Sequence, residues 1–215
     1  MKSLSSVRAP RQSAATREAG ILAGAVRVFA EASFAQADTA ELAAAAGVSP
    51  AALYRYFPSK RDLYVATLRD AGPRLLALWR QARDTNPDPA GVIWDIGMAY
   101  YDHIMNASPF LKLWFQALGE AADPEIRELV AETLGGGAEI IAGVIRDGQA
   151  AGQFRADLDA RAEAWRFMGI GFSMNVTEIL GFTADYTRAD VERWGRHFID
   201  SLRTDALHSP GKEVH

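Results

Sequence analysis

The sequence predicts an all-α protein, and three observations carry that prediction. Apolar residues recur at steps of three and four along most of the chain, which is the period of an amphipathic helix. No convincing run of alternating β-branched residues, the pattern of a half-buried strand, interrupts this period. Prolines, glycines and capping residues divide the chain into segments of helical length.

Composition narrows the class of protein further. The chain has 215 residues, of which 49% are hydrophobic, enough for one domain or two small ones with a real core. It contains no cysteine, which excludes disulfides, thiolate zinc sites, iron–sulfur clusters and cysteine nucleophiles. This composition fits a reducing cytosol, and a cytoplasmic location is expected. Charged residues interrupt every apolar run before it reaches the ~20 residues of a membrane helix, so no membrane partner is expected.

Charge is distributed unevenly along the chain. Residues 1–64 carry eight Lys and Arg against five Asp and Glu, a net charge of +3. The remainder carries fifteen against twenty-two, a net charge of −7. A basic front on an acidic body indicates an anionic partner for the front, although a chance fluctuation with a solvated tail is an equal alternative.

Three short helices are expected at the front, over residues 16–32, 39–46 and 50–56. Asp38 is a good N-cap for the second helix, and Glu41 three residues later suggests a capping box. Gly47 ends that helix, and Ser49 caps the third helix with Pro50 at its first position. Two short helices joined by a tight glycine-containing turn form a helix-turn-helix. Leu53 would then anchor the third helix to the core, leaving Pro50, Ala51, Tyr54 and Arg55 facing outward.

The rest of the chain is expected to form a helical body. A helix over residues 60–83, which Ser59 would cap, should kink or break at Gly72-Pro73, because proline removes a helical hydrogen bond and clashes one turn back. Further helices are expected at 90–106, 109–121, 124–151, 157–180 and 188–204. The predicted organisation is a mobile basic arm at 1–15, a helix-turn-helix domain at 16–62, a ligand-binding and dimerisation domain at 63–204 and a flexible tail at 205–215.

The front of the chain resembles a known family. Residues 47–60 read GVSPAALYRYFPSK, with Leu63 following, and the approach segment 25–34 reads AVRVFAEASF. These residues resemble the tetracycline-repressor (TetR) family of bacterial regulators over about residues 16–65. Ser33 stands where a glycine is usual in the family. The body resembles the family in length, helical pattern and the turns at Asp123-Pro124 and Gly152-Gln153-Phe154.

The resemblance implies roles on DNA for residues of the front. Tyr54, Tyr56, Thr39 and Lys60 would contact phosphates, while Pro50, Ala51 and Arg55 would lie nearest the base edges; Arg55 alone offers a bidentate fork to guanine. The full candidate set for double-stranded DNA is Thr39, Ser49, Pro50, Ala51, Ala52, Tyr54, Arg55, Tyr56 and Lys60. Phe57 is interpreted as a core residue. The basic arm would either track a minor groove or stay solvated.

The segment 157–180 predicts a subunit interface. Apolar residues step 4-3-4-3 along it, and two further apolar faces flank this seam, so the helix must be buried on nearly every side. A homodimer explains this burial, and the family resemblance implies an interface from the last two long helices; an ordinary intrachain core is the alternative. The candidate interface residues are Trp165, Gly169, Phe172, Val176, Trp194, Phe198 and Leu202.

Aromatic and methionine side chains in the body predict an apolar ligand cavity. The candidates are Trp94, Met98, Tyr101, His103, Trp114, Met168, Phe172 and Asn175. Each of them could equally be core, and His103 is interpreted more readily as a satisfied core histidine. The chain shows no catalytic motif, no metal-ligating pattern and no phosphate-cradling glycine loop, so neither an enzyme nor a cofactor is expected.

Together these patterns predict a homodimeric transcriptional regulator. Its most economical form is a repressor that a small, largely apolar or aromatic effector releases from a near-palindromic operator. A ligand-independent regulator or an activator is the alternative, and an all-helical ligand carrier or enzyme is a more distant one. The identity of the effector and the operator sequence do not follow from the sequence.

Overall fold

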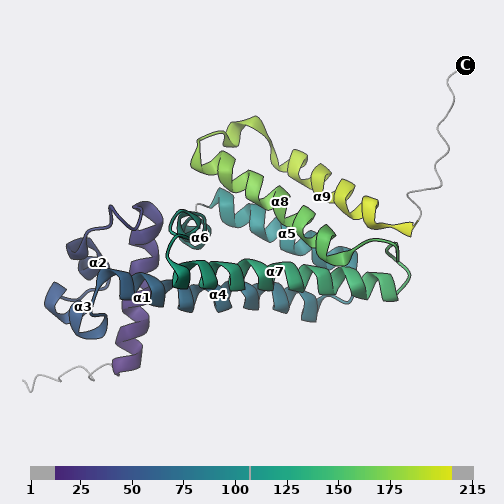
Figure 1. The fold of residues 1–215 in the computed structure, drawn as a ribbon. Coiled ribbons are helices and arrows are strands. Elements are labelled where there is room, and N and C mark those ends of the chain that lie inside the picture. Colours follow the sequence, from purple (N-terminus) through teal and green to yellow (C-terminus); the bar gives the residue numbers. More distant parts are fainter. Residues whose placement is uncertain (1–12, 107, 205–215) are drawn as a thin grey trace, which may run out of the picture. The chain divides into compact units, whose positions relative to one another are not determined.

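The computed structural model describes residues 13–106 and 108–204, which fold almost entirely as helices (Figure 1). The helices are α1 (Ala14–Glu31), α2 (Thr39–Ala45), α3 (Pro50–Tyr56), α4 (Lys60–Thr85), α5 (Pro89–Met105), α6 (Pro109–Gly119), α7 (Pro124–Ala150), α8 (Ala160–Ile179), the short 3₁₀ helix η1 (Thr183–Asp185) and α9 (Arg188–Leu202). The predicted all-α class is confirmed. The predicted basic arm up to residue 12 and the predicted tail at 205–215 lie outside the described residues.

Two helices start two or three residues away from the expected position, because the residue that caps them differs from the expected one. α1 begins at Ala14 instead of residue 16, because the Ser13 hydroxyl accepts the Thr16 N–H at 3.1 Å. Residues 14 and 15, assigned to the arm from the sequence, are therefore helical. α8 begins at Ala160 instead of 157, because the Asp159 carboxylate accepts the N–H groups of the first turn.

The sequence predicted a kink or a break at Gly72-Pro73. α4 runs through Pro73 as one helix, so a break is wrong, and the kink stays a prediction. The packing of α4 against α7 explains its continuity. Small residues of α7 receive large side chains of α4: Leu76 packs on Gly136, and Trp79 packs on Gly137. Gly136 and Gly137 thus serve close packing of α7 on α4, and we infer that these contacts offset the local cost of the proline.

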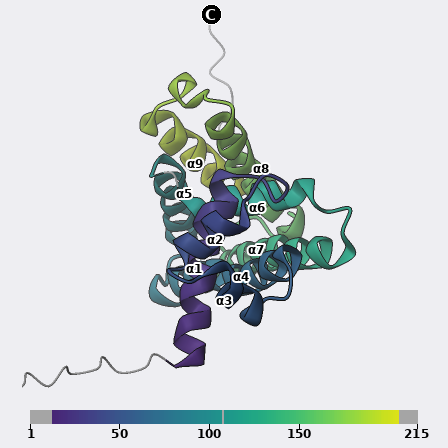
Figure 2. The same ribbon diagram turned by 90° about the vertical axis from the view of Figure 1, so that its left-hand side faces the viewer.

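The described residues form two compact units, which divide between Thr67 and Leu68. In the first unit, α2 packs against both α1 and α3 (Figure 2). Leu42 and Leu53 are buried in this unit, and Phe29 and Tyr64 are fully buried with their rings edge-on and ring centres 4.8 Å apart. These buried side chains set the position and orientation of α3 within the first unit.

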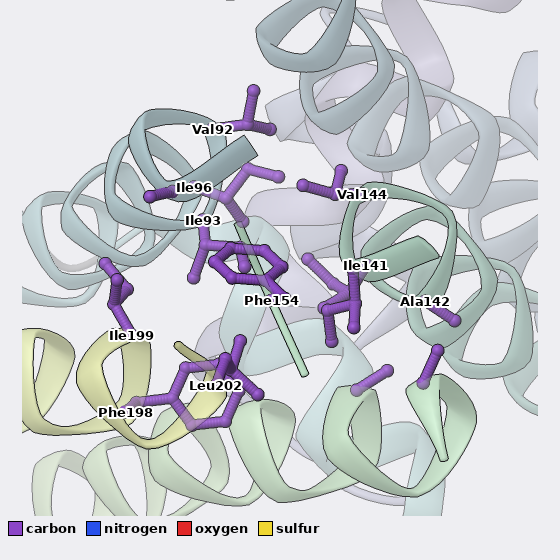
Figure 3. Packing of buried hydrophobic residues seen from close by; sticks show 14 of the residues in the cluster. Val92, Ile93, Ile96, Ile141, Ala142, Val144, Phe154, Phe198, Ile199 and Leu202 are labelled. Carbon is purple, nitrogen blue, oxygen red and sulfur yellow. The ribbon is translucent and has the colours of Figure 1, made fainter. Parts of the chain in front are cut away.

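The second unit is a helical body whose core is centred on a residue from a turn. α5, α7, α8 and α9 supply the apolar side chains of this core. Phe154, between α7 and α8, is 1% exposed, and its ring lies between Ile93 and Ile141 with Leu202 close by (Figure 3). The Arg155 N–H donates to the Leu202 carbonyl at 2.8 Å, which ties this turn to the end of α9. No described helix has the length and apolar composition needed to cross a membrane.

The start of α9 contributes a pH-dependent element of stability. Thr187 and Asp190 form a reciprocal capping box, and Arg193 pairs with the same carboxylate. Hydrogen bonds from Thr187 and then from Arg193 lower the pKa of Asp190 from 3.8 to about 2. At the start of α2, the expected capping box with Glu41 does not form. A single capping hydrogen bond is present instead, in which the Asp38 carboxylate accepts the Ala40 N–H.

We predict that Asp190→Asn removes one component of acid sensitivity. A carboxylate with a lowered folded pKa adds stability that is fully present above pH 3.8 and is lost as pH falls through about 2. The wild-type protein should therefore lose more thermal stability than the variant between pH 4 and pH 2, as measured by circular dichroism melts. If the melting temperatures of the two proteins fall equally between pH 4 and pH 2, Asp190 has no pairing role.

Candidate functional site

α2 and α3 form the helix-turn-helix that the sequence predicts. Gly47 adopts a φ of 65°, the left-handed conformation that the tight turn requires. The Val48 N–H closes the turn on the Ala43 carbonyl at 3.0 Å. Ser49 then caps α3, accepting the Ala52 N–H at 3.2 Å, and Pro50 occupies the first helical position. Leu53 is 3% exposed and anchors the inner face of α3.

The outer face of α3 consists of exposed side chains. Pro50, Ala51, Tyr54 and Arg55 are all exposed, as the sequence predicts for a recognition helix. Ala52 and Tyr56 are half-buried, and Phe57 is buried in the core of the unit. The hydroxyls of Tyr54 and Thr39 lie 3.2 Å apart and are hydrogen-bonded, so two candidate phosphate ligands from α2 and α3 meet at one point.

Lys60 is placed differently from the other candidates. Its ammonium donates to the carbonyls of Ala35 and Ala37, at 3.2 and 3.0 Å, and lies 5.0 Å from the centre of the Phe34 ring. These contacts fasten the start of α4 to the loop between α1 and α2. Since an ammonium has three N–H donors, one remains for a phosphate. The main role of Lys60 in this structure is therefore to stabilise the first unit.

A polar groove beside α3 brings in a residue that the sequence analysis missed. Arg17 and Thr16 from the first turns of α1 line this groove together with Arg55 and Tyr56 from α3 and with Gly47 from the turn. Arg17 thus adds a second guanidinium next to the outer face of α3. The sequence shows Arg17 as a positive charge near the start of the first helix. Its position next to α3 depends on how α1 and α3 are packed, which the sequence does not show.

The body contains a cavity of about 80 Å³ with an almost wholly apolar wall. Side chains of α5, α6 and α8 form most of this wall, with smaller contributions from α4, α7 and α9. Five of the eight predicted ligand candidates line it: Trp94, Met98, Trp114, Met168 and Phe172. The sequence therefore predicted an apolar, aromatic and methionine-containing wall.

The other three candidates lie outside the wall. Tyr101 is buried, with the guanidinium of Arg188 5.6 Å from its ring centre. His103 is exposed, so the interpretation as a core histidine is wrong. Asn175 is 3% exposed and acts from behind the wall, because its amide donates to the hydroxyl of Tyr100 and, at 3.1 Å, to the Gly171 carbonyl.

Tyr100 is a lining residue that the sequence analysis did not select. Its neighbour Tyr101, which was among the candidates, does not line the cavity. Burial raises the pKa of Tyr100 to about 12, although the hydrogen bond from Asn175 acts in the opposite direction. The phenol therefore stays neutral over the whole physiological range.

The predicted interface residues fall into three groups in a single copy of the chain. Trp165, Gly169 and Val176 are exposed along one face of α8, whereas Phe172 and Trp194 are half-buried. Phe198 and Leu202 are 3% and 0% exposed and belong to the chain's own core. Large apolar side chains at the end of α8 and just after it are also exposed, namely Ile179, Leu180 and Phe182.

Comparison with known proteins finds a family similarity at the front of the chain. Residues 21–67, which span most of α1, the helix-turn-helix and the start of α4, match the model for bacterial regulatory proteins of the tetR family. Over these residues the chain is similar to the tetR family. An uncharacterized HTH-type transcriptional regulator of Haemophilus influenzae is 31% identical over 125 residues, which is 54% of this chain and 60% of that protein.

Two further comparisons extend the similarity beyond this segment. The HTH-type transcriptional activator FasR of Mycolicibacterium smegmatis is 33% identical over 100 residues, 46% of each chain. The matches thus span 60% or less of the curated relatives' own lengths. A transcriptional regulator from Saccharomonospora viridis, solved in complex with choline, is 22% identical with a TM-score of 0.73, covering 86% of this chain and 96% of that one. The fold is thus shared over most of the chain.

Within residues 13–106 and 108–204, no group of three or more His, Asp and Glu side chains is placed to hold a metal ion.

Proposed function

We propose that this protein is a DNA-binding transcriptional regulator of the tetR family that acts as a homodimer and responds to a small molecule. The observation that carries the proposal is the exposed face of α3, held on a capped helix-turn-helix within the part of the chain that matches the family. Such a helix fits the major groove of B-form DNA, with its side chains on base edges and neighbouring hydroxyls on phosphates. The candidate DNA residues are those listed above, with Arg17 added.

Dimerisation supplies the second recognition helix. Trp165 and Val176 are 41% and 46% exposed on α8, with the open surface of Gly169 between them. Exposed apolar side chains in a continuous row indicate a protein interface. A second copy of the chain would cover this row through a two-fold axis, which makes the operator near-palindromic. The two recognition helices would then enter major grooves about 34–36 Å apart.

A small molecule in the cavity would control the affinity for DNA. The molecule lowers DNA affinity if it binds better to a conformation whose recognition helices are wrongly spaced, and the effect equals its differential binding free energy. This mechanism favours a repressor that the ligand releases. An activator is the second candidate, because one relative, FasR, is named a transcriptional activator. A reporter gene downstream of the selected operator distinguishes the two by the sign of the change.

We expect Arg55→Ala and Tyr54→Phe to change DNA binding in different ways. Duplexes selected from a random-sequence library by the wild-type protein provide the operator. Arg55→Ala should cost about 1–3 kcal/mol per base contact and relax the preference at one position of each half-site. Tyr54→Phe removes one hydroxyl from the Thr39 pair and should weaken binding to all duplexes equally.

Arg127→Ala is the matched control for the loss of one positive charge, because Arg127 is exposed on α7 in the body. Its affinity should equal that of the wild type at the same salt concentration. If Arg55→Ala retains both the affinity and the sequence preference of the wild type, α3 does not read DNA through this residue.

Trp165→Glu is expected to weaken self-association strongly. A charge in the centre of an apolar interface is desolvated without a partner, so the dimer should dissociate at concentrations where the wild type stays associated. Analytical ultracentrifugation measures the effect. Leu78→Glu, at an apolar residue of α4 that is 52% exposed, is the control and should leave association unchanged. A Trp165→Glu protein as dimeric as the wild type would move the interface elsewhere.

A further inference from the structure

Among the described residues, none of those that line the body cavity has a charged side chain. The lining residues are aliphatic, aromatic, methionine or glycine. The strong side-chain hydrogen-bond donors among them are the indole N–H groups of Trp79, Trp94 and Trp114 and the hydroxyl of Tyr100. No carboxylate, ammonium, guanidinium, imidazole or side-chain amide is among them. The wall therefore offers hydrogen-bond donors and no counter-charge.

Trp114 carries the most informative of these donors. It is 5% exposed, and its Nε1–H finds no hydrogen-bond acceptor in the described part of the chain. A buried donor without an acceptor is unfavourable and rare in folded proteins, so such a group in a cavity wall indicates a missing acceptor. Its ring is fixed in place, because a Cβ added at Gly72 of α4 would meet the ring at 3.3 Å.

Tyr100 presents the second donor from another helix. Asn175 donates to the phenol oxygen, and Gly171 lets the Tyr100 ring lie so close to α8 that an added Cβ would be 2.9 Å from it. The phenol is thus oriented by two residues of α8. Since burial raises its pKa to about 12, it keeps its proton and can donate it.

We propose that the cavity recognises an uncharged, largely apolar molecule through one acceptor oxygen, such as a ketone, lactone or ester carbonyl, which binds Trp114 Nε1–H and the Tyr100 hydroxyl. This inference rests on the proposed ligand response and specifies its chemistry. A carboxylate would lose its hydration in the cavity without gaining a cation. A quaternary ammonium would find aromatic faces but would also lie against an unpartnered N–H donor, which repels a cation.

The volume of the cavity sets the size of the test compounds. A cavity of about 80 Å³ is smaller than the roughly 150 Å³ apolar cavity that holds benzene, so a single aromatic ring with a short substituent is the largest probe to use and enters as neighbouring side chains shift. Acetophenone and α-methylstyrene have the same shape and differ by a carbonyl in place of a methylene group. Benzoate and phenyltrimethylammonium place an anion or a cation on the same ring. Ligand-observed NMR on the full chain without DNA gives the relative affinities of all four.

We expect acetophenone to bind about 3- to 10-fold more tightly than α-methylstyrene, the range that one or two neutral hydrogen bonds provide. Benzoate and phenyltrimethylammonium should bind at least 10-fold more weakly than acetophenone. Trp114→Phe and Tyr100→Phe keep the aromatic wall and should each reduce the preference for the ketone. Neither variant should change the affinity for α-methylstyrene, which controls for a collapsed cavity.

Three outcomes would overturn the proposal. They are a charged compound that binds as well as acetophenone, a ketone preference that survives in both variants, and no binding by any of the four compounds. Binding to the selected operator is measured separately without ligand. Loss of DNA binding with an intact ketone preference would refute the proposed regulator and leave the cavity chemistry standing, whereas the reverse result would refute the cavity chemistry alone.

Discussion

Phe154→Ala is expected to lower the free energy of unfolding of the body by about 3–5 kcal/mol, the usual cost of truncating a buried phenylalanine. The side chain is 1% exposed and fills the centre of the apolar core of the body, where α5, α7 and α9 converge (Figure 3). No flexible surface element can collapse into the space left behind, because helices surround the ring. Urea denaturation followed by circular dichroism gives the change.

Gly148→Ala should cost a comparable amount for a related reason. A Cβ at Gly148 would lie 2.1 Å from the Phe154 ring, so the methyl group and the ring cannot occupy their positions together. The ring cannot withdraw, since the Phe154 N–H donates to the Gly148 carbonyl at 3.1 Å and Gly152 closes the turn with a φ of 72°. The new methyl group therefore expels the ring from the core.

The double variant Gly148→Ala/Phe154→Ala makes this explanation testable. Once the ring is removed, the added methyl group has no clash, so the second substitution should cost almost nothing and the coupling should reach the upper end of about 0.5–3 kcal/mol. Gly135→Ala on the same helix is the control, because the nearest atom to its Cβ is 3.8 Å away in the Arg161 side chain. Additive effects of the two substitutions would show that the clash is not the cause.

The importance of Phe154 could not be predicted from the sequence. Helix positions follow from caps and periodicity, and the start of α3 at Pro50 and the turn at Gly47 were predicted from those signals alone. Phe154 lies in a turn after Gly152, and turn residues usually lie on the surface. Its burial depends on the path of α9, which brings Leu202 to the turn. That path is a tertiary property with no local signal.

The same limit applies to the candidate sites. The residues of α8 read as apolar on nearly every side, so periodicity predicted a buried helix without assigning its faces. The structure places Met168 in the cavity wall, Ala164 in the core and Trp165 on the surface. On α5, Tyr100 and Tyr101 are adjacent and chemically identical, and only the packing against α8 decides that Tyr100 faces the cavity.

Two glycines of α1 should respond to alanine with opposite signs. At Gly24, a Cβ would lie 2.7 Å from the Ala45 carbonyl oxygen and 2.8 Å from its carbon, so α1 and α2 approach each other backbone to backbone. Because no side chain can rotate away, Gly24→Ala must push α2 off α1, at a cost at or above the usual ~1–3 kcal/mol of overpacking. At Gly20, no atom lies within 4 Å of the Cβ position. Gly20→Ala should instead stabilise the helix by about 0.5–1 kcal/mol.

This pair of variants also links packing to DNA binding. α2 carries Thr39 and leads into the turn at Gly47 that orients α3, so displacing α2 moves the hydroxyl pair and the exposed face of α3 together. Gly24→Ala should therefore lose affinity for the selected operator more than any single truncation on α3, while Gly20→Ala retains wild-type affinity. Chemical denaturation and DNA titration of both proteins measure the two effects. If Gly24→Ala unfolds and binds like the wild type, the close crossing of α1 and α2 does not set the position of the recognition helix.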